Sequence, residues 1–153
     1  QSSAVLMNNA TAMRTQFTSG ILEGWSGSLD QDPAAPMSGT KLIVFTLNAG
    51  VFVPGAPGNG LTLDAPVLES GIAYLRKPTA QLWQGLVLAL GTVNSLVYRA
   101  NPVDANAISD THARIKMDVS GETGTGTAKL SKLTYTVIGE PVDVSSMQLA
   151  FGN

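Results

Sequence analysis

The glycine-rich run GETGTGT, residues 121–127, is the stretch most suggestive of ligand chemistry. A phosphate-binding glycine loop leads into a helix whose first amide N–H groups point at the anion, often with a lysine behind them. Here the run is followed by AKLSKLTYTVI, residues 128–138, which has the pattern of a strand. The sequence therefore predicts a flexible hairpin connection between two strands rather than a phosphate site.

His112 is the only histidine, and the chain has no cysteine. General acid–base catalysis needs a partnered imidazole in a pocket, and the sequence offers no partner for this one. Without cysteine, and without an HExxH or GxSxG motif, zinc hydrolysis and the common nucleophilic triads have no sequence support. We therefore expect a non-enzymatic protein with no catalytic residue, no cofactor and no metal, in which His112 is satisfied or faces solvent.

Two carboxylates lie two residues apart in SLDQDPAAP, residues 28–36, and this spacing could begin a calcium loop. The EF-hand pattern then asks for a third oxygen ligand and a glycine, but Pro33 and Ala34 stand in the way. We expect Asp30 to form a turn by accepting backbone N–H bonds.

Three aromatic residues, Trp25, Trp83 and Tyr98, could form a platform on which a sugar ring stacks. Each lies in an apolar segment, where packing in the core explains it as well. A carbohydrate-binding module would require Trp25 or Trp83 to be exposed.

The composition favours one soluble domain, residues 1–153, that assembles with other chains. Hydrophobic residues make up 44% of the chain but charged residues only 13%, about half the usual share. Surfaces with so little charge approach one another without a heavy desolvation penalty. The net charge of −2 without a basic block predicts no nucleic-acid partner. The longest apolar run, near LVLALG at 86–91, predicts no membrane span.

One helix is expected, from Asn9 to Glu23, because apolar residues recur there at positions 10, 13, 17 and 21. Asn8 or Asn9 would cap its start, and Gly24 would end it. Residues 1–8 would then form an extended N-terminal arm.

Short strands account for most of the remaining chain. TKLIVFTL at 40–47 is typical of a central strand, and VFVP, LWQGLVLAL and SLVYRA are further candidates. Residues 113–119 alternate strictly, which predicts a buried face with Ile115 and Met117 and a wet face with Arg114, Lys116 and Asp118.

The alternation slips in phase within residues 128–138, and again at Ser145 and Ser146 within residues 142–151. A β-bulge or a sharp bend explains each slip. The predicted fold class is therefore mainly β, an antiparallel β-sandwich or jelly-roll-like domain with one short N-terminal helix.

The order of these segments resembles a group of small structural proteins of tailed bacteriophages. The resemblance rests on the N-terminal helix (NNATAMRTQFTSGILEG), the stretch GWSGSLDQDPAAPMSGTKLIVFTL, the strand WQGLVLALGT and the closing segment IGEPVDVSSMQLAF. It implies a β-sandwich of the virion, a capsid decoration or cement protein that binds the major capsid protein and copies of itself.

Three hypotheses for the function stay open at this point. They are a capsid cement protein, a tail or baseplate component of the same kind of phage, and a carbohydrate-binding β-sandwich. The candidate contacts of the first lie in the N-terminal segment and in two Pro/Gly loops: Val5, Leu6, Met7, Asp32, Pro33, Pro36, Pro54 and Pro57.

Overall fold

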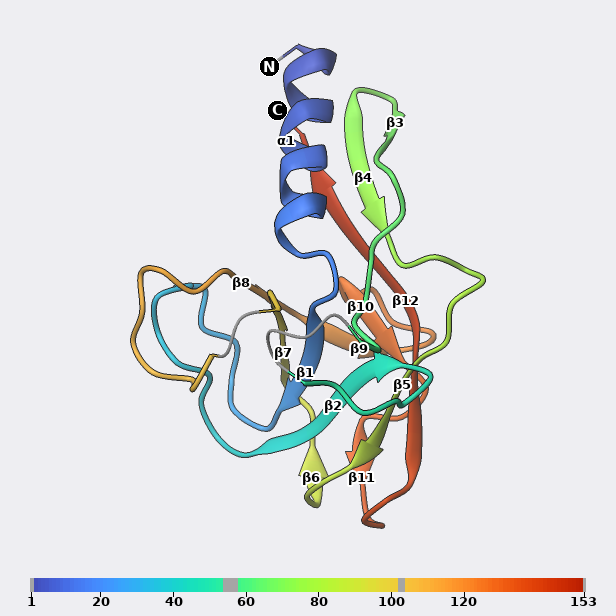
Figure 1. Ribbon diagram of the computed structural model, residues 1–153. Coiled ribbons are helices and arrows are strands. Elements are labelled where there is room, and N and C mark those ends of the chain that lie inside the picture. The colour runs from blue at the N-terminus through green and yellow to red at the C-terminus, as the bar shows by residue number, and fades with distance from the viewer. Residues whose placement is uncertain (1, 54–57, 102–103, 153) are drawn as a thin grey trace.

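The structure, a computed structural model, describes residues 2–53, 58–101 and 104–152 (Figure 1). Within these ranges it contains one helix, α1 (Ser3–Gln16), and is otherwise mainly β, as predicted. The strands are β1 (Ile21–Trp25), β2 (Lys41–Leu47), β3 (Val67–Glu69), β4 (Ile72–Arg76), β5 (Trp83–Val87), β6 (Gly91–Thr92), β7 (Ser95–Arg99), β8 (Arg114–Met117), β9 (Val119–Gly121), β10 (Ala128–Leu130), β11 (Thr134–Tyr135) and β12 (Pro141–Phe151).

The main sheet has the order β3-β4-β12-β5-β2-β1-β7-β8, and every pair along this path is antiparallel. β10 pairs with β12, and β9 pairs with β10. β6 and β11 form a separate two-stranded ribbon.

The pairing brings the sheet back onto itself. Only Asp118 separates β8 from β9, so the path that ends at β8 resumes at β9 and returns through β10 to β12. The sheet is therefore curled around one interior. Trp83 of β5 and Tyr98 of β7 meet there with ring centroids 6.2 Å apart, although β2 and β1 lie between their strands in the sheet.

Helix α1 stands at one end of the curled sheet, beside β4 and the last part of β12 (Figure 1). It buries Leu6 and Ala10. The predicted boundaries are wrong: the helix begins at Ser3, where the Ser2 side chain accepts from the Val5 N–H at 3.3 Å, and it ends at Gln16. The expected extended arm over residues 1–8 is accordingly helical from Ser3 onward.

The helix stops early because the chain turns sharply before β1. Ser19 has φ 60°, outside the helical region, and a side chain at Gly20 would meet the Arg99 carbonyl oxygen at 2.3 Å. Ile21, which extends the apolar spacing of the helix, instead begins a strand that pairs with β2 on one side and β7 on the other. Strand pairing therefore overrides the helical period from residue 20.

Several strand predictions are confirmed, and two are corrected. The segments predicted at 40–47, LWQGLVLAL and SLVYRA contain β2, β5 and β7, whereas VFVP forms no named strand in its described part, residues 51–53. The predicted slip at Ser145 and Ser146 is a register shift in the pairing of β10 with β12. GETGTGT does join two strands, but β9 and β10 pair in parallel, so the connection is not a hairpin.

Candidate functional site: a clamped loop over a buried ionic network

A second layer of loops covers the outer face of β1, β7 and β8. Glu23, Val97 and Lys116 are neighbours across these three strands, and Arg99 lies opposite Arg114. Two loops, residues 26–40 and 104–113, lie over this face. Between sheet and loops lies a small apolar cluster of Trp25, Met37 and Val97.

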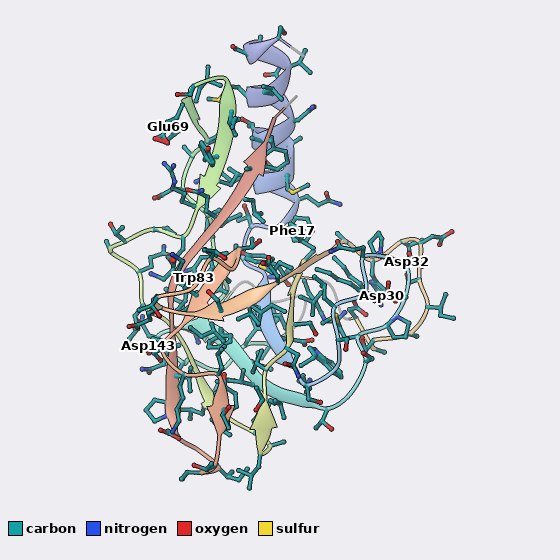
Figure 2. The ribbon with its side chains drawn as sticks, turned by 180° about the vertical axis from the view of Figure 1, so that it is seen from behind. Phe17, Asp30, Asp32, Glu69, Trp83 and Asp143 are labelled. Atoms are coloured by element: carbon teal, nitrogen blue, oxygen red, sulfur yellow. The ribbon has the colours of Figure 1, made fainter. Side chains whose placement is uncertain are left out.

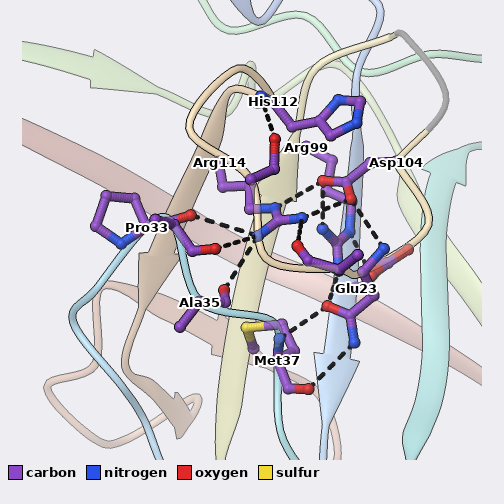
Figure 3. A network of polar contacts seen from close by, with 12 residues as sticks. Glu23, Pro33, Ala35, Met37, Arg99, Asp104, His112 and Arg114 are labelled. Carbon is purple, nitrogen blue, oxygen red and sulfur yellow. Dashed lines mark hydrogen bonds and ion pairs between the residues drawn. The ribbon is translucent and has the colours of Figure 1, made fainter.

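Asp104 is the centre of the polar contacts in this layer (Figure 3). Its Oδ2 accepts from Arg99 Nη1 at 2.6 Å and from Arg114 Nε at 2.8 Å, and its Oδ1 accepts from Arg114 Nη2 at 2.7 Å. The backbone N–H of Asn106 donates to the same Oδ1 at 2.9 Å. The Asp104 side chain is only 4% exposed, so these bonds replace its hydration.

Glu23 supplies the second carboxylate. Its Oε1 accepts from Arg99 Nε at 2.8 Å and from Trp25 Nε1 at 3.0 Å. Lys41 Nζ lies 3.9 Å from its Oε2. Two buried carboxylates therefore balance two buried guanidinium groups, which is the condition under which such charges can be held away from water.

The network fixes the 26–40 loop at several points. Arg114 Nη1 donates to the carbonyl oxygens of Pro33, Ala34 and Ala35 at 3.4, 3.3 and 3.1 Å. The Asn106 side chain pairs with the backbone of Met37, accepting from its N–H at 2.8 Å and donating to its carbonyl oxygen at 3.1 Å. The loop is thus clamped to the sheet by side chains that lie more than 60 residues away in the chain.

The electrostatics of the network follow from this geometry. Burial by itself would raise the pKa of Asp104. The hydrogen bonds from Arg114, the Asn106 N–H and Arg99 outweigh it and hold the pKa of Asp104 well below its ordinary value. The carboxylate beside Arg114 in turn raises the pKa of that guanidinium. Asp104 and Arg114 therefore form a charged pair at neutral pH.

This arrangement suits a structural role better than a chemical one. A general base or a nucleophile needs a lone pair that can reach a substrate, but the oxygens of Asp104 are occupied by four donors. What the network can do is hold the shape of the loop that carries Asp30, Asp32 and Pro33. A contact loop fixed in this way loses little conformational entropy when it binds.

Two buried polar atoms lack a hydrogen-bond partner among the described residues, Lys116 Nζ and the Tyr135 hydroxyl. They lie in different sheets: Lys116 is on β8 under the loop layer, and Tyr135 is on β11 of the two-stranded ribbon with its ring in the main core. Burial raises the pKa of the Tyr135 hydroxyl, so it stays protonated.

The predicted contact residues lie in three places: on the clamped loop, on α1, and in a segment outside the described residues. Asp32 and Pro33 are exposed and Pro36 is half-buried on the clamped loop, while Val5 is 43% exposed and Met7 half-buried on α1. Leu6 is only 2% exposed, because it packs into the core, so its assignment as a subunit contact is wrong. Pro54 and Pro57 lie outside the described residues.

The aromatic residues, Asp30 and His112 take part in packing or in local hydrogen bonds. Trp83 and Tyr98 are fully buried and Trp25 is 9% exposed, so these rings form no exposed sugar platform. Asp30 Oδ1 accepts from the Asp32 N–H at 2.9 Å, which confirms its predicted turn. His112 is half-buried at the edge of the network, where its backbone N–H donates to Ser109 Oγ.

Neither a metal centre nor a membrane-spanning helix occurs in the described part of the chain. It contains no group of three or more His, Asp or Glu side chains arranged to hold a metal ion. Its helix is too short to cross a bilayer.

The arginines and Asp104 were missed by sequence reasoning. The alternation predicts that Arg114 lies on a wet face, yet it is only 6% exposed because the two loops cover that face. Arg99 ends the strand SLVYR, in which every residue is buried. A charged residue at the end of such a strand was the one available signal that a buried partner is required.

No family model matches the chain, and no curated protein or solved structure is significantly similar to it.

Proposed function

We propose that this protein is a non-enzymatic structural component of a tailed-bacteriophage particle, a capsid decoration or cement protein that stabilises the head by bridging capsid subunits. Its partners would be the major capsid protein and further copies of itself, and its location the virion. We also propose that the curled sheet is a β-sandwich or jelly roll. The contact of Trp83 with Tyr98 across the interior supports this assignment.

The observation that carries the proposal is a row of exposed apolar side chains, which we call the apolar edge. Leu86, Leu88 and Leu90 alternate along β5 and its continuation and are 46%, 53% and 56% exposed. Val137 and Ile138, 56% and 59% exposed, lie in the turn before β12. The Gly139 N–H donates to the Val87 carbonyl oxygen at 2.8 Å, which holds this turn against β5.

Such an edge is typical of a surface that another protein covers. Single exposed apolar residues are ordinary, but several side by side mark a contact site or a tendency to aggregate. A weak contact of this kind becomes effective when many copies act on one symmetric particle. The clamped loop and the exposed face of α1, with Val5, would supply further rigid contacts.

The proposal is tested by locating the chain in purified phage particles. We expect mass spectrometry of separated heads and tails to find it in heads, in a fixed ratio to the major capsid protein. Particles that lack the chain would overturn the virion role, and its presence only in tails would replace the cement role with the tail or baseplate one.

A binding experiment tests the surface itself. Leu88→Ser combined with Ile138→Ser should abolish rebinding of purified protein to heads from which it has been stripped. The matched control is Val67→Ser, which changes a side chain of similar exposure, 46%, on the distant β3 hairpin (Figure 1). If the double variant and the control rebind equally well, the apolar edge is not the surface that binds the head.

A further inference from the structure

A groove lined by cations and hydroxyl groups lies on the side of the sheet away from the clamped loop. It has a volume of about 480 Å³ and is formed by three segments distant in sequence: the residues after β4, the GETGTGT loop with β10, and the middle of β12. Arg76, Lys77 and Lys129 contribute positive charge, and no carboxylate lines it. We call it the cationic groove.

Most of the charge in the cationic groove is not neutralised by a direct ion pair. Arg76 is held by Glu69 and Gln148, but Lys77 Nζ donates only to the carbonyl oxygens of Pro78 and Gln81. The Lys129 side chain forms no hydrogen bond or ion pair within the described part of the chain. Burial lowers the pKa of Lys77, and the nearby charge of Asp143 offsets this only in part.

The groove also offers free hydroxyl groups and no free amide cradle. Thr79, Thr125 and Ser146 line it, and none of their hydroxyls is hydrogen-bonded to another described residue. The amides of Gly126 and Thr127 already donate to Ser120 Oγ and Asp118 Oδ1. Flexible amines and hydroxyls suit a carboxylate, whereas a phosphate loop would use the backbone N–H groups that are occupied here.

The molecule carries a complementary group on its opposite side. Asp30 and Asp32 are exposed on the clamped loop and form no ion pair among the described residues. Each uses one oxygen, Oδ1, to hold the turn. Figure 2 shows both at one side of the molecule, whereas Trp83 and Asp143 lie at the other. Lys77 of the groove lies over the Trp83 ring, 6.0 Å from its centroid.

We propose that copies of this chain associate head to tail, with the Asp30–Asp32 turn of one copy seated in the cationic groove of the next. The acidic turn cannot reach the groove of its own chain, because the two lie on opposite sides. A heterologous contact of this kind repeats from copy to copy and closes into a ring or extends as a chain. The inference rests on the proposed function, because a protein that bridges capsid subunits acts in many neighbouring copies. The head-to-tail contact specifies how those copies bind one another.

A charge swap tests the contact. We expect sedimentation velocity to show that the unmodified protein self-associates at low ionic strength. Salt at about 0.5 M should reverse this association, because it screens charges that lie more than a few ångströms apart. Asp32→Lys and Lys129→Glu should each lower the association constant at least about tenfold. The double variant should restore it, because the two reversed charges again attract.

The controls separate this contact from general charge effects. Asp110→Lys reverses an exposed carboxylate in the neighbouring loop and should leave association unchanged. Circular dichroism should show that all variants are folded. A protein that stays monomeric at low salt, or single reversals that associate like the unmodified chain, would overturn the inference. If the protein stays monomeric but still binds phage heads, the head-to-tail contact is wrong and the cement role stands. If the chain self-associates but is absent from phage particles, the contact stands and the cement role is wrong.

Discussion

Asp104 and the two arginines that bind it are all buried beneath the loop layer. Their geometry is that of a buried ion cluster, in which each charge is tolerated only because its partners are in place. Removing one member is therefore more costly than the mean strength of a salt bridge would indicate. Sequence reasoning could not find the cluster, because Arg99, Asp104 and Arg114 are brought together only by the pairing of β7 with β8 and by the loop above them.

Asp104→Asn should lower the free energy of unfolding by about 3–5 kcal/mol, the usual cost of leaving buried charges unpaired. Arg99 and Arg114, only 3% and 6% exposed, would lose their shared carboxylate. Urea unfolding at pH 7 measures the change. Asp110→Asn, at an exposed position, should change the same quantity by less than about 0.5 kcal/mol. Equal effects of the two substitutions would contradict a structural role for the cluster.

The same group makes stability depend on pH in the acid range. The folded state holds the pKa of Asp104 below its ordinary value of 3.8, so the unfolded chain takes up the proton first as pH falls. The stabilisation is complete above that value and is lost as pH falls through the lower pKa of the folded state. The stability difference between the unmodified protein and Asp104→Asn should therefore shrink below about pH 4. A constant difference from pH 7 to pH 2 would show that the carboxylate charge is not responsible.

Among the secondary-structure elements, the sequence predicts the position of several strands well and the ends of the helix poorly. Alternation in residues 113–119 predicts a strand there correctly but misses the burial of Arg114, whereas the slip at Ser145 is a local register shift that the sequence records directly. The end of α1 depends on the pairing of β1 with β2 and β7, and the parallel pairing of β9 with β10 depends on the path of the whole sheet. Such long-range pairing leaves no periodic trace in the local sequence.

The docking of α1 can be tested with two neighbouring residues. Leu6→Ala should lower the free energy of unfolding by about 2–5 kcal/mol, since it removes a buried side chain from the core. Val5→Ala, at a position 43% exposed, should have an effect below about 1 kcal/mol. Thermal unfolding followed by circular dichroism gives both values. Similar losses in the two variants would mean that the helix does not pack through Leu6.

Close packing of β5 against β2 depends on Gly85. A side chain there would lie 2.4 Å from the Val44 carbonyl oxygen and 2.8 Å from Ile43 Cγ1. Gly85→Ala should therefore destabilise the fold by about 1–3 kcal/mol through overpacking. Gly121→Ala, where a side chain would meet open space, is the matched control and should be nearly neutral. If urea midpoints of the two variants agree, β5 can shift away from β2 at no cost.

At the scale of the whole molecule, the closed path of strand pairing joins the core and the loop layer into one unit. Trp83 reports on the core and Trp25 on the cluster beneath the clamped loop. We expect the variants Trp25→Phe and Trp83→Phe, each with one remaining tryptophan, to show fluorescence midpoints that coincide with circular dichroism, as two-state unfolding requires. An earlier change of the Trp25 signal would show that the loop layer detaches first.

The strand β12 occupies a special place in this path, because it pairs with β5, β10 and β4 along successive parts of its length. It also follows all three of these strands in the chain. While residues 141–151 remain in the ribosomal exit tunnel, neither the curled sheet nor the docking of α1 beside β12 can be completed. We therefore expect folding of the sheet to wait for this strand, rather than to proceed segment by segment as the chain emerges.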